Sequence, residues 1–258
     1  MSDAAGLTCD AFLDGQLTIT QPKTGFRAST DAVLLAASVP AQSGETVLDI
    51  GCGVGTASLC LLNRVDAQVT GLELQGEYAD LALQNSKENG HSLEVISEDL
   101  FAPTKAFKER SFDHIMTNPP FFSNQSIVPP ADSGKATAHM HSESLSDWIT
   151  FGLKRLKQGG YLTAIIRSDD LAELLGSLSQ SSGAIRILPI AARASNPAKR
   201  VIVQARKAIN GPTELLAPLV MHQGESHDGD KDNYSEIARS ILRSGSAIES
   251  LMPKNGRD

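Results

Sequence analysis

Several features are scarce in this sequence, and each scarcity excludes a class of protein. The chain has only three cysteines, Cys9, Cys52 and Cys60. Their number is odd and none has the spacing of metal ligands, so we expect reduced thiols in a cytosolic protein and not a disulfide framework. No apolar run reaches the length of a transmembrane helix, and the N-terminus lacks the basic-then-apolar pattern of a signal peptide. No internal repeat is found at solenoid periods.

Positive charge is scarce as well. The 258 residues include 23 Lys and Arg against 30 Asp and Glu, which gives a formal net charge of −7. This argues against a strongly basic nucleic-acid-binding protein, although it is compatible with a local basic surface. Hydrophobic residues make up 41% of the chain, enough for a sizeable core. The length suits one α/β domain with additions or two small domains.

The most informative stretch that is present runs from Val47 to Thr56. A short apolar run, typical of a buried parallel strand, turns through Gly51, Gly53 and Gly55 into a helix-compatible run. Glycines let the backbone approach a ligand closely, and a helix N-terminus offers free N–H groups. The third glycine comes one residue too early for the dinucleotide pattern G-x-G-x-x-G, and Asp49 precedes the first glycine by two positions. A tight turn without a ligand is the alternative interpretation.

Acidic residues end the next two predicted strands. The strand Gln68–Leu74 contains Glu73, which lies 22 residues after Gly51 (73 − 51). An acid at that distance can accept hydrogen bonds from both ribose hydroxyls, but NAD-dependent enzymes use the same device. A third strand over Leu93–Glu98 is followed by Asp99, which can accept a bond from an adenine amino group, while Leu100 or Phe101 packs on the ring.

A strand over Phe112–Thr117 runs directly into Asn118-Pro119-Pro120-Phe121. Two consecutive prolines prevent helix or ladder pairing and stiffen the backbone. Asn118 and the Pro119 carbonyl are therefore expected at the carboxyl edge of the sheet, where open α/β sheets bind ligands. A plain Pro-Pro turn is the alternative.

A polar segment over residues 123–142 follows this motif and predicts a loop beside the crevice, a candidate lid. His139 and His141 alternate within it, but two histidines without a nearby third ligand do not predict a metal site. Their role stays open.

The remaining pattern alternates strands and helices, which predicts a doubly wound sheet. We expect an N-terminal hairpin and helix extension over residues 1–43, a core domain over 44–210, and a C-terminal extension over 211–258. The predicted elements are a loose terminus over 1–10, a hairpin over 12–19, helices over 32–39, 76–89, 143–157, 169–179 and 234–244, strands over 161–166, 184–190, 200–205 and 214–221, and a disordered last dozen residues.

The D-x-G-x-G-x-G pattern resembles motif I of S-adenosylmethionine (SAM)-dependent methyltransferases, and the order of elements resembles their seven-stranded class I fold, with strand order 3-2-1-4-5-7-6, over residues 44–207. Asn-Pro-Pro-Phe resembles motif IV of methyltransferases that act on planar nitrogen. The resemblance implies SAM as cofactor and S-adenosylhomocysteine as product. The cofactor-binding residues that it implies are Asp49, Gly51, Gly53, Gly55, Glu73, Leu74, Asp99, Leu100 and Asn118; the catalytic ones are Asn118, Pro119, Pro120 and Phe121.

Flanking segments narrow the resemblance to the bacterial tRNA(Val) adenine-N(6) methyltransferase family. They are Gln21–Arg27, Ser29–Leu35, Glu73–Gln75 with Tyr78-Ala79 and Asn85, and Arg193–Val203. The sequence departs from that family in Phe121, where Tyr is frequent, and in Ala32, where Gly is common. The resemblance implies a cytoplasmic enzyme that methylates the 6-amino group of an adenine in tRNA or another structured RNA. The alternatives are a glutamine-amide or small-molecule methyltransferase, a non-catalytic SAM-dependent RNA-binding protein, and an NAD-dependent dehydrogenase; the oligomeric state stays open.

A local excess of basic residues agrees with an RNA substrate. The span from Ala184 to Asn210 contains six Lys and Arg residues and no Asp or Glu. We expect it to contact RNA phosphates, although a solvated hairpin surface is the alternative. The predicted RNA contacts are Lys23, Arg27, Arg193, Lys199 and Arg200, and no metal is predicted.

Overall fold

The computed structural model describes residues 6–120, 144–224 and 233–253. Within them the chain forms a nine-stranded sheet and a separate two-stranded hairpin. The strands are β1 (Leu7–Phe12), β2 (Leu17–Pro22), β3 (Thr46–Ile50), β4 (Gln68–Glu73), β5 (Leu93–Ser97), β6 (Phe112–Thr117), β7 (Leu156–Arg167), β8 (Ser182–Ala191), β9 (Arg200–Lys207), β10 (Glu214–Leu215) and β11 (Leu219–Val220). The helices are α1 (Thr30–Ser38), α2 (Thr56–Arg64), α3 (Gly76–Glu88), α4 (Lys105–Lys108), α5 (Leu145–Arg155), α6 (Leu171–Leu178) and α7 (Glu236–Ser244).

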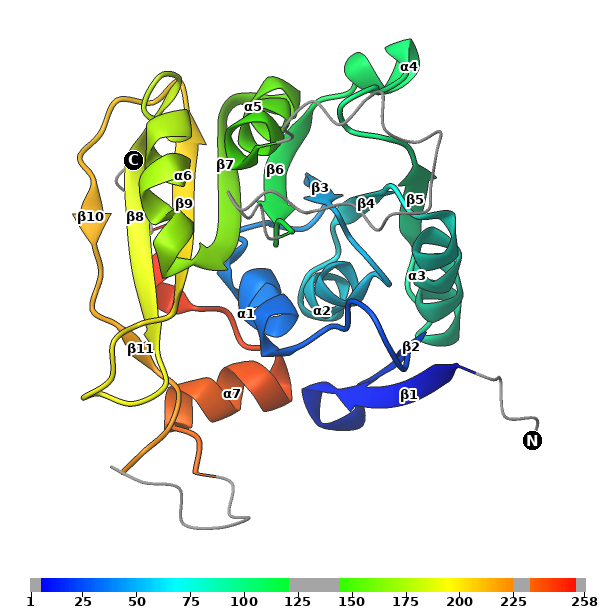
Figure 1. The fold of residues 1–258 in the computed structure, drawn as a ribbon, viewed down its shortest axis with the longest axis horizontal. Coiled ribbons are helices and arrows are strands. Elements are labelled where there is room, and N and C mark those ends of the chain that lie inside the picture. The colour runs from blue at the N-terminus through cyan, green and yellow to red at the C-terminus, as the bar shows by residue number, and fades with distance from the viewer. Residues whose placement is uncertain (1–5, 121–143, 225–232, 254–258) are drawn as a thin grey trace, which may run out of the picture.

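The order of strands confirms the predicted class I fold. From β8 on one side to β5 on the other, the sheet runs β8-β9-β7-β6-β3-β4-β5 (Figure 1), which is 6-7-5-4-1-2-3 when the core strands are counted in chain order. β3 to β7 are parallel, while β9 is antiparallel to both β7 and β8, so the predicted final hairpin is confirmed. The parallel strands end at one edge of the sheet, and this edge positions the site.

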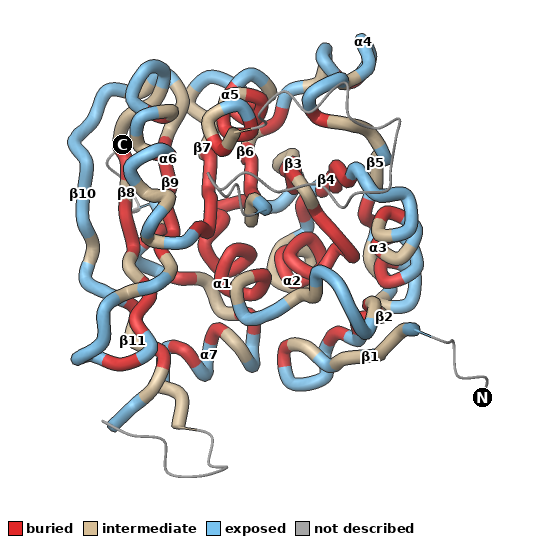
Figure 2. Tube along the Cα trace, in the orientation of Figure 1, coloured by how far each residue is buried: buried red, intermediate tan, exposed pale blue. Residues whose placement is uncertain are grey.

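Two hydrophobic clusters cover the two faces of this sheet. One is formed mainly by α1, α2 and α7 with the hairpin turn, and the other by α5 and α6 with Phe107 of α4. Because both faces are covered, the central strands are buried along their length (Figure 2), which explains their continuous apolar runs.

The N-terminal expectation is wrong for residues 7–10. Leu7 already pairs with Pro22, so β1 and β2 form a six-pair antiparallel hairpin. The Asp-Gly signal marks the turn correctly, but the turn is a short 3-10 segment over Leu13–Gly15, in which Leu13 and Asp14 have positive φ. Leu13 is 1% exposed and packs in the core, which fixes the hairpin to the body of the protein.

The C-terminal expectations need two corrections. The strand predicted over 214–221 is two separate short strands, β10 and β11, each parallel to β8, because Pro218 between them lacks an N–H for continuous pairing. The expected disorder of the last dozen residues is wrong for residues up to 253. A 3-10 turn over Glu249–Leu251 lies there, and Ile248 and Leu251 are buried. The N–H of Ile248 also donates to the carbonyl of Ala37 at 2.8 Å.

Candidate active site

The glycine turn after β3 opens the site. Gly51, Gly53 and Gly55 have φ of 71°, 56° and 83°, a region that other residues rarely adopt. The N–H groups of Gly51 and Cys52 donate to the carbonyl of Leu72, which ties the turn to the end of β4. A side chain on Gly51 would also meet Trp148 at 2.9 Å. Because these residues have no side chains, the backbone of the turn at Gly51 and Gly53 is exposed to the cavity described next.

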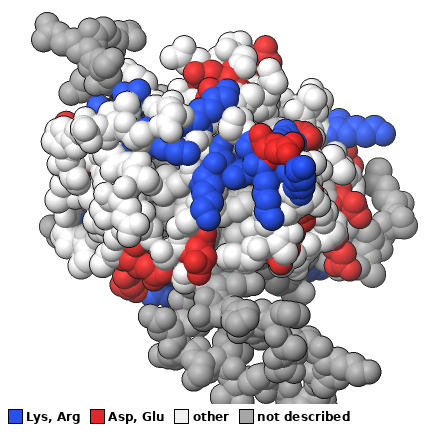
Figure 3. Space-filling view, turned by 90° about the horizontal axis from the view of Figure 1, so that it is seen from above, with Lys and Arg blue, Asp and Glu red and all other residues white. Residues whose placement is uncertain are grey.

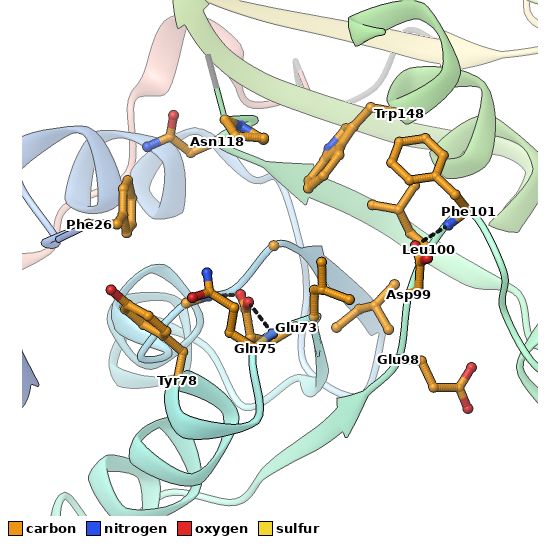
Figure 4. A pocket seen from close by; sticks show the side chains of 15 residues that line it. Phe26, Glu73, Gln75, Tyr78, Glu98, Asp99, Leu100, Phe101, Asn118 and Trp148 are labelled. Carbon is orange, nitrogen blue, oxygen red and sulfur yellow. Dashed lines mark hydrogen bonds between the residues drawn. The ribbon is translucent and has the colours of Figure 1, made fainter. Parts of the chain in front are cut away.

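A cavity of about 250 Å³ lies at the carboxyl ends of β3, β4, β5 and β6 (Figure 4). Figure 4 shows Trp148 and Phe101 at one end, which we call the apolar end, and Phe26 at the other, with Glu73 and Gln75 between them. The other lining residues are Gly51, Gly53, Leu72, Leu74, Tyr78, Glu98, Asp99, Leu100, Asn118 and Pro120.

Glu73 stands at the middle of this cavity in a fixed orientation. Its Oε2 accepts from the N–H of Gly53 at 2.9 Å, and its Oε1 accepts from the N–H of Gln75 at 2.9 Å. A charged carboxylate at a buried turn needs such donors. Asp99 is fixed in a similar way, since its Oδ1 accepts from the N–H of Phe101 at 2.8 Å. Both acids retain acceptor capacity toward the cavity, because a carboxylate has about four lone-pair sites.

Asp49 occupies a smaller adjoining cavity of about 30 Å³, between the glycine turn and the N-terminus of α1. It is 2% exposed and accepts a hydrogen bond from the Ser58 hydroxyl at 2.7 Å. Burial raises the pKa of Asp49 to about 7, and the nearby charge of Glu73 adds to the rise, while the Ser58 hydrogen bond opposes it. Near neutral pH this carboxyl is close to the midpoint of its titration.

Trp148 of α5 closes the apolar end. Its indole N–H donates to the Thr117 hydroxyl at 2.9 Å, and that hydroxyl donates to the carbonyl of Ile50 at 2.9 Å. The edge of the ring of Phe101 meets Trp148 at a centroid distance of 6.5 Å. The chain of bonds fixes a flat apolar wall at the end of β6. The helix predicted over 143–157 does not by itself reveal this role, because nothing in a local pattern shows that the ring of Trp148 reaches across to the turn after β3.

Asn118 and Pro120 line both the 250 Å³ cavity and a third cavity of about 340 Å³, which we call the outer cavity, and Pro119 lines the outer cavity alone. The outer cavity is lined by Gly25, Phe26, Arg27, Ser29, Asp31, Asn118, Pro119, Pro120, Leu145, Ile166, Arg167, Asp170 and Arg200. Among the described residues, the side chain of Asn118 has no hydrogen-bonding partner, so its amide is available to a ligand. Phe121 and the segment with His139 and His141 lie outside the described residues.

Of the predicted cofactor residues, all but Gly55 line one of two adjoining cavities. Gly51, Gly53, Glu73, Leu74, Asp99, Leu100 and Asn118 line the 250 Å³ cavity, and Asp49 lines the small cavity beside it. Gly55 lines neither, because it lies against Ala82 and Leu93 as the first residue before α2. Its role in this structure is close packing of the turn on α3. Phe26, Gln75 and Tyr78 also line the cavity, and the sequence marked them only through the family resemblance.

The basic span from Ala184 to Asn210 does not form one surface in the structure. Arg193 is 9% exposed, and its guanidinium donates to the carbonyls of Gln223 and Gly224, both at 2.7 Å, so it holds two segments together. Lys207 donates to the carbonyls of Leu153 and Leu156 at the opposite edge of the sheet. Figure 3 views the molecule from the top of Figure 1, which is the side at which β9 ends. Basic side chains are gathered on this side.

The other predicted RNA contacts differ in their availability. Arg27 and Arg200 line the outer cavity but are paired with Asp10 at 2.8 Å and Asp31 at 2.9 Å. Lys23 and Lys199 are exposed, and neither is ion-paired within the described residues. Among those residues, no group of three potential metal ligands is present, and no helix is long and apolar enough to cross a membrane.

The geometry fits SAM. Bare glycine backbone lies beside a buried acid, a fixed carboxylate stands where a ribose would bind, and an apolar aromatic slot next to Asp99 suits a purine. Together with the strand order, these features define a class I SAM-dependent methyltransferase.

Comparisons with known proteins agree. The model of the methyltransferase small domain family matches residues 27–187. The chain is 29% identical to a tRNA1(Val) (adenine(37)-N6)-methyltransferase of Shewanella halifaxensis, covering 87% of this chain and 93% of that protein. It is 31% identical to the Shewanella loihica protein of that name, covering 64% of this chain and 70% of that protein. The chain therefore belongs to the methyltransferase small domain family and, within it, to the tRNA1(Val) adenine-N6-methyltransferases, which have SAM as their cofactor.

Solved structures support the fold. A protein described as a predicted O-methyltransferase from Agrobacterium tumefaciens aligns with a TM-score of 0.67 at 24% identity, covering 84% of this chain and 97% of that one. A 16S rRNA guanine-N2 methyltransferase of T. thermophilus, solved with AdoMet and guanosine, aligns with a TM-score of 0.56 at 19% identity, covering 78% of this chain and 50% of that one.

Proposed function

We propose that this enzyme transfers a methyl group from SAM to the exocyclic 6-amino group of an adenine in tRNA, in the cytoplasm. The observation that carries the proposal is the position of Asn118, which lines both the 250 Å³ cavity, here called the cofactor cavity, and the outer cavity, while Pro119 next to it lines the outer cavity. The names of the relatives support tRNA as the substrate and adenine 37 as the base that they modify.

The chemistry explains why Asn118 and Pro119 suit this position. The lone pair of an exocyclic amine is delocalised into the purine ring, so the amine is a poor nucleophile. The Asn118 side-chain oxygen and the Pro119 carbonyl can each accept one amine hydrogen, which turns the lone pair out of conjugation and stabilises the positive charge that develops on nitrogen. When bound, SAM would supply the electrophilic methyl group, with S-adenosylhomocysteine as the leaving group. The resulting ammonium then loses one proton to solvent.

Each wall of the site has a task in this proposal. Glu73 would bind the ribose hydroxyls, and Asp99 with Leu100, Phe101 and Trp148 would hold the adenine of the cofactor. An adenine of RNA must leave its stack to enter the outer cavity, since the amine has to reach Asn118. Lys23 and Lys199, which are exposed and unpaired among the described residues, would contact phosphates from outside.

We expect Asn118→Ala to lower kcat by about 10²–10³, as loss of one oxyanion-hole donor does in other enzymes, because the amide is used most in the transition state. The SAM Kd should stay within about threefold of wild type. The measurement combines methyl transfer from labelled SAM to unmodified tRNA, mass spectrometry of the nucleosides, and calorimetry of SAM binding.

Asn210→Ala is a matched control, since Asn210 is an exposed asparagine just beyond β9 at the opposite edge of the sheet. It should behave as wild type. If wild type methylates a glutamine-bearing peptide and not tRNA, the proposed substrate is wrong. If Asn118→Ala loses SAM binding and kcat in equal measure, Asn118 is a structural residue.

A further inference from the structure

Phe26 has an unusual place in this molecule. Its side chain is 56% exposed although it is aromatic, and it lies in the loop between β2 and α1. Phe26 and Asn118 are the two described residues that line all three cavities: the cofactor cavity, the small cavity beside Asp49, and the outer cavity. Figure 4 shows Phe26 beside Asn118, at the end of the cofactor cavity that is remote from Phe101.

The loop that carries Phe26 is held in place by partly buried hydrogen bonds. Gln21 is 1% exposed, and its side-chain oxygen accepts from the N–H of Ala28 at 2.9 Å. Asp10 accepts from both the Gln21 amide and the Arg27 guanidinium, each at 2.8 Å, and these bonds lower the pKa of Asp10. Arg27 also donates to the carbonyl of Pro22 at 3.0 Å. The backbone on both sides of the ring is therefore fixed before any ligand binds.

The ring itself rests on the glycine turn. A Cβ built on Gly53 would lie 3.6 Å from the ring of Phe26, and one built on Gly25 would lie 3.0 Å from the Tyr78 hydroxyl. One side of the ring thus lies against the backbone at the cofactor cavity, while more than half of the side chain stays exposed. Exposed aromatic surface next to unpaired polar acceptors is an arrangement suited to a flat, polar heterocycle.

We propose that Phe26 is a stacking platform for the target adenine, which places the 6-amino group of the base at Asn118. The inference rests on the proposed function, since it names how the same site binds its substrate. A base that has left its stack in RNA loses its neighbours, and stacking on an aromatic side chain replaces part of that interaction. Phe101, at the other end, lines the cofactor cavity but not the outer cavity, so the two rings serve two different purines.

The experiment compares three substitutions in the intact enzyme. Phe26→Leu keeps an apolar side chain but removes the π face, Phe26→Tyr restores it, and Phe101→Leu is the matched control at the other end of the cavity. We expect Phe26→Leu to lower kcat/KM for tRNA by roughly 5- to 150-fold, the equivalent of 1–3 kcal/mol. Phe26→Tyr should restore most of the activity, and the SAM Kd of both should stay within about threefold of wild type. Phe101→Leu should instead weaken SAM binding.

A direct readout uses a tRNA stem-loop with 2-aminopurine, whose amino group is on C2 and not on C6, in place of the target adenine, so that it reports the stacking of the base alone. In a Phe26→Trp variant, a base stacked on position 26 touches an indole, which quenches 2-aminopurine emission. We expect lower emission in the complex of this variant than in the wild-type complex, and no such difference for Phe101→Trp.

Two outcomes would overturn the inference by itself. One is a wild type that methylates tRNA while Phe26→Leu retains wild-type kcat/KM and Phe26→Trp leaves the emission unchanged. The other is a Phe26→Leu variant with SAM affinity lost in proportion to activity, which would make Phe26 a cover for the cofactor. A wild type that does not methylate tRNA would overturn the proposed function, and the platform with it.

Discussion

Asp49 and Glu73 are two carboxyl groups on neighbouring strands in this site, and their surroundings differ. Glu73 accepts two backbone N–H bonds at the cavity, whereas Asp49 is enclosed and has the Ser58 hydroxyl as its side-chain donor. Because burial favours the neutral acid, the pKa of Asp49 rises to about 7. A cationic ligand near Asp49 would favour the charged form and lower this pKa, so the binding of SAM should release a proton near neutral pH.

We therefore expect the SAM Kd to rise by up to roughly tenfold per pH unit as the pH falls below 7, since the carboxylate must be regenerated for binding. Asp49→Asn should bind SAM weakly with little of this pH dependence. Calorimetry between pH 5.5 and 8, in buffers of different ionisation enthalpy, measures both affinity and released protons. A wild type without proton release would contradict the prediction.

The same group affects stability with a definite sign. The pKa of Asp49 in the folded protein, about 7, exceeds the 3.8 of an ordinary aspartate, so the folded state binds the proton more tightly. The contribution of Asp49 to the free energy of unfolding is fully present below pH 4 and is lost as the pH rises toward 7. The melting temperature of Asp49→Asn minus that of wild type should accordingly increase between pH 5 and 8. Thermal unfolding of both proteins at these pH values tests this.

At the scale of elements, α3 holds the N-terminal hairpin beside the glycine turn. Asn85 bonds both the N–H and the carbonyl of Thr20, at 2.8 and 3.0 Å, and Asn89 bonds both groups of Thr18, each at 2.8 Å. Residues four apart on a helix are about 6 Å apart along its axis, and residues two apart on a strand are separated by about 6.6 Å, so the two asparagines match the free edge of β2. The amide of Asn85 also donates to the carbonyl of Val54 in the turn, at 3.0 Å.

Asn85→Ala should lower the free energy of unfolding by about 3 kcal/mol, because it leaves backbone groups unsatisfied at a position that is 0% exposed. Asn89→Ala, with the same contacts to β2 but partial exposure, should cost about 1 kcal/mol. Only Asn85→Ala should also weaken SAM, since it alone touches the glycine turn. Urea unfolding and SAM titration of both variants measure these effects. Equal losses of unfolding free energy would contradict the prediction that burial makes Asn85 the more costly residue to replace.

At the scale of the whole molecule, the sheet divides the basic residues between its two edges. In the backbone register of β7 and β9, Arg200 lies opposite Arg167 at the carboxyl end of β7, while Arg206 lies opposite Tyr161, six residues earlier in β7. Six residues of strand separate Arg200 and Arg206 by about 20 Å. A run of basic residues in sequence therefore becomes two groups, and only the group with Lys199 and Arg200 lies near Asn118.

The double substitution Lys23→Glu with Lys199→Glu should weaken tRNA binding and flatten the log–log salt dependence by roughly 1.4–1.8, as expected for about two phosphate contacts. Arg193→Ala should leave that slope unchanged and lower stability by roughly 1.5–3 kcal/mol, because a buried guanidinium bonds two carbonyls there. Filter binding over a salt series and urea unfolding measure the two effects. Identical slopes for wild type and the double variant would exclude these lysines as RNA contacts.

Local patterns predicted the strands and helices of the core well, since the glycine turn, the acids at the ends of β4 and β5, and Asn118-Pro119 each lie within one short stretch. The ends of the chain were predicted poorly. β1 and the turn at Glu249–Leu251 are ordered through contacts with distant segments, such as Ile248 with Ala37, which no local pattern reveals. The division at residues 43 and 210 stays a prediction.

The sequence by itself determined the class of fold and the position of Asn118 at the end of a strand, because these follow from patterns of adjacent residues, and the resemblance of its motifs implied SAM as the cofactor. Only the tertiary structure decided which side chains meet. It buried Arg193, brought Trp148 onto Gly51, moved Gly55 away from the cavity, and placed Phe26 beside Asn118, 92 positions further along the chain (118 − 26). The physical reason is that burial, ion pairing and cavity walls depend on distances between elements, and those distances are fixed by how the helices and the hairpin pack on the sheet.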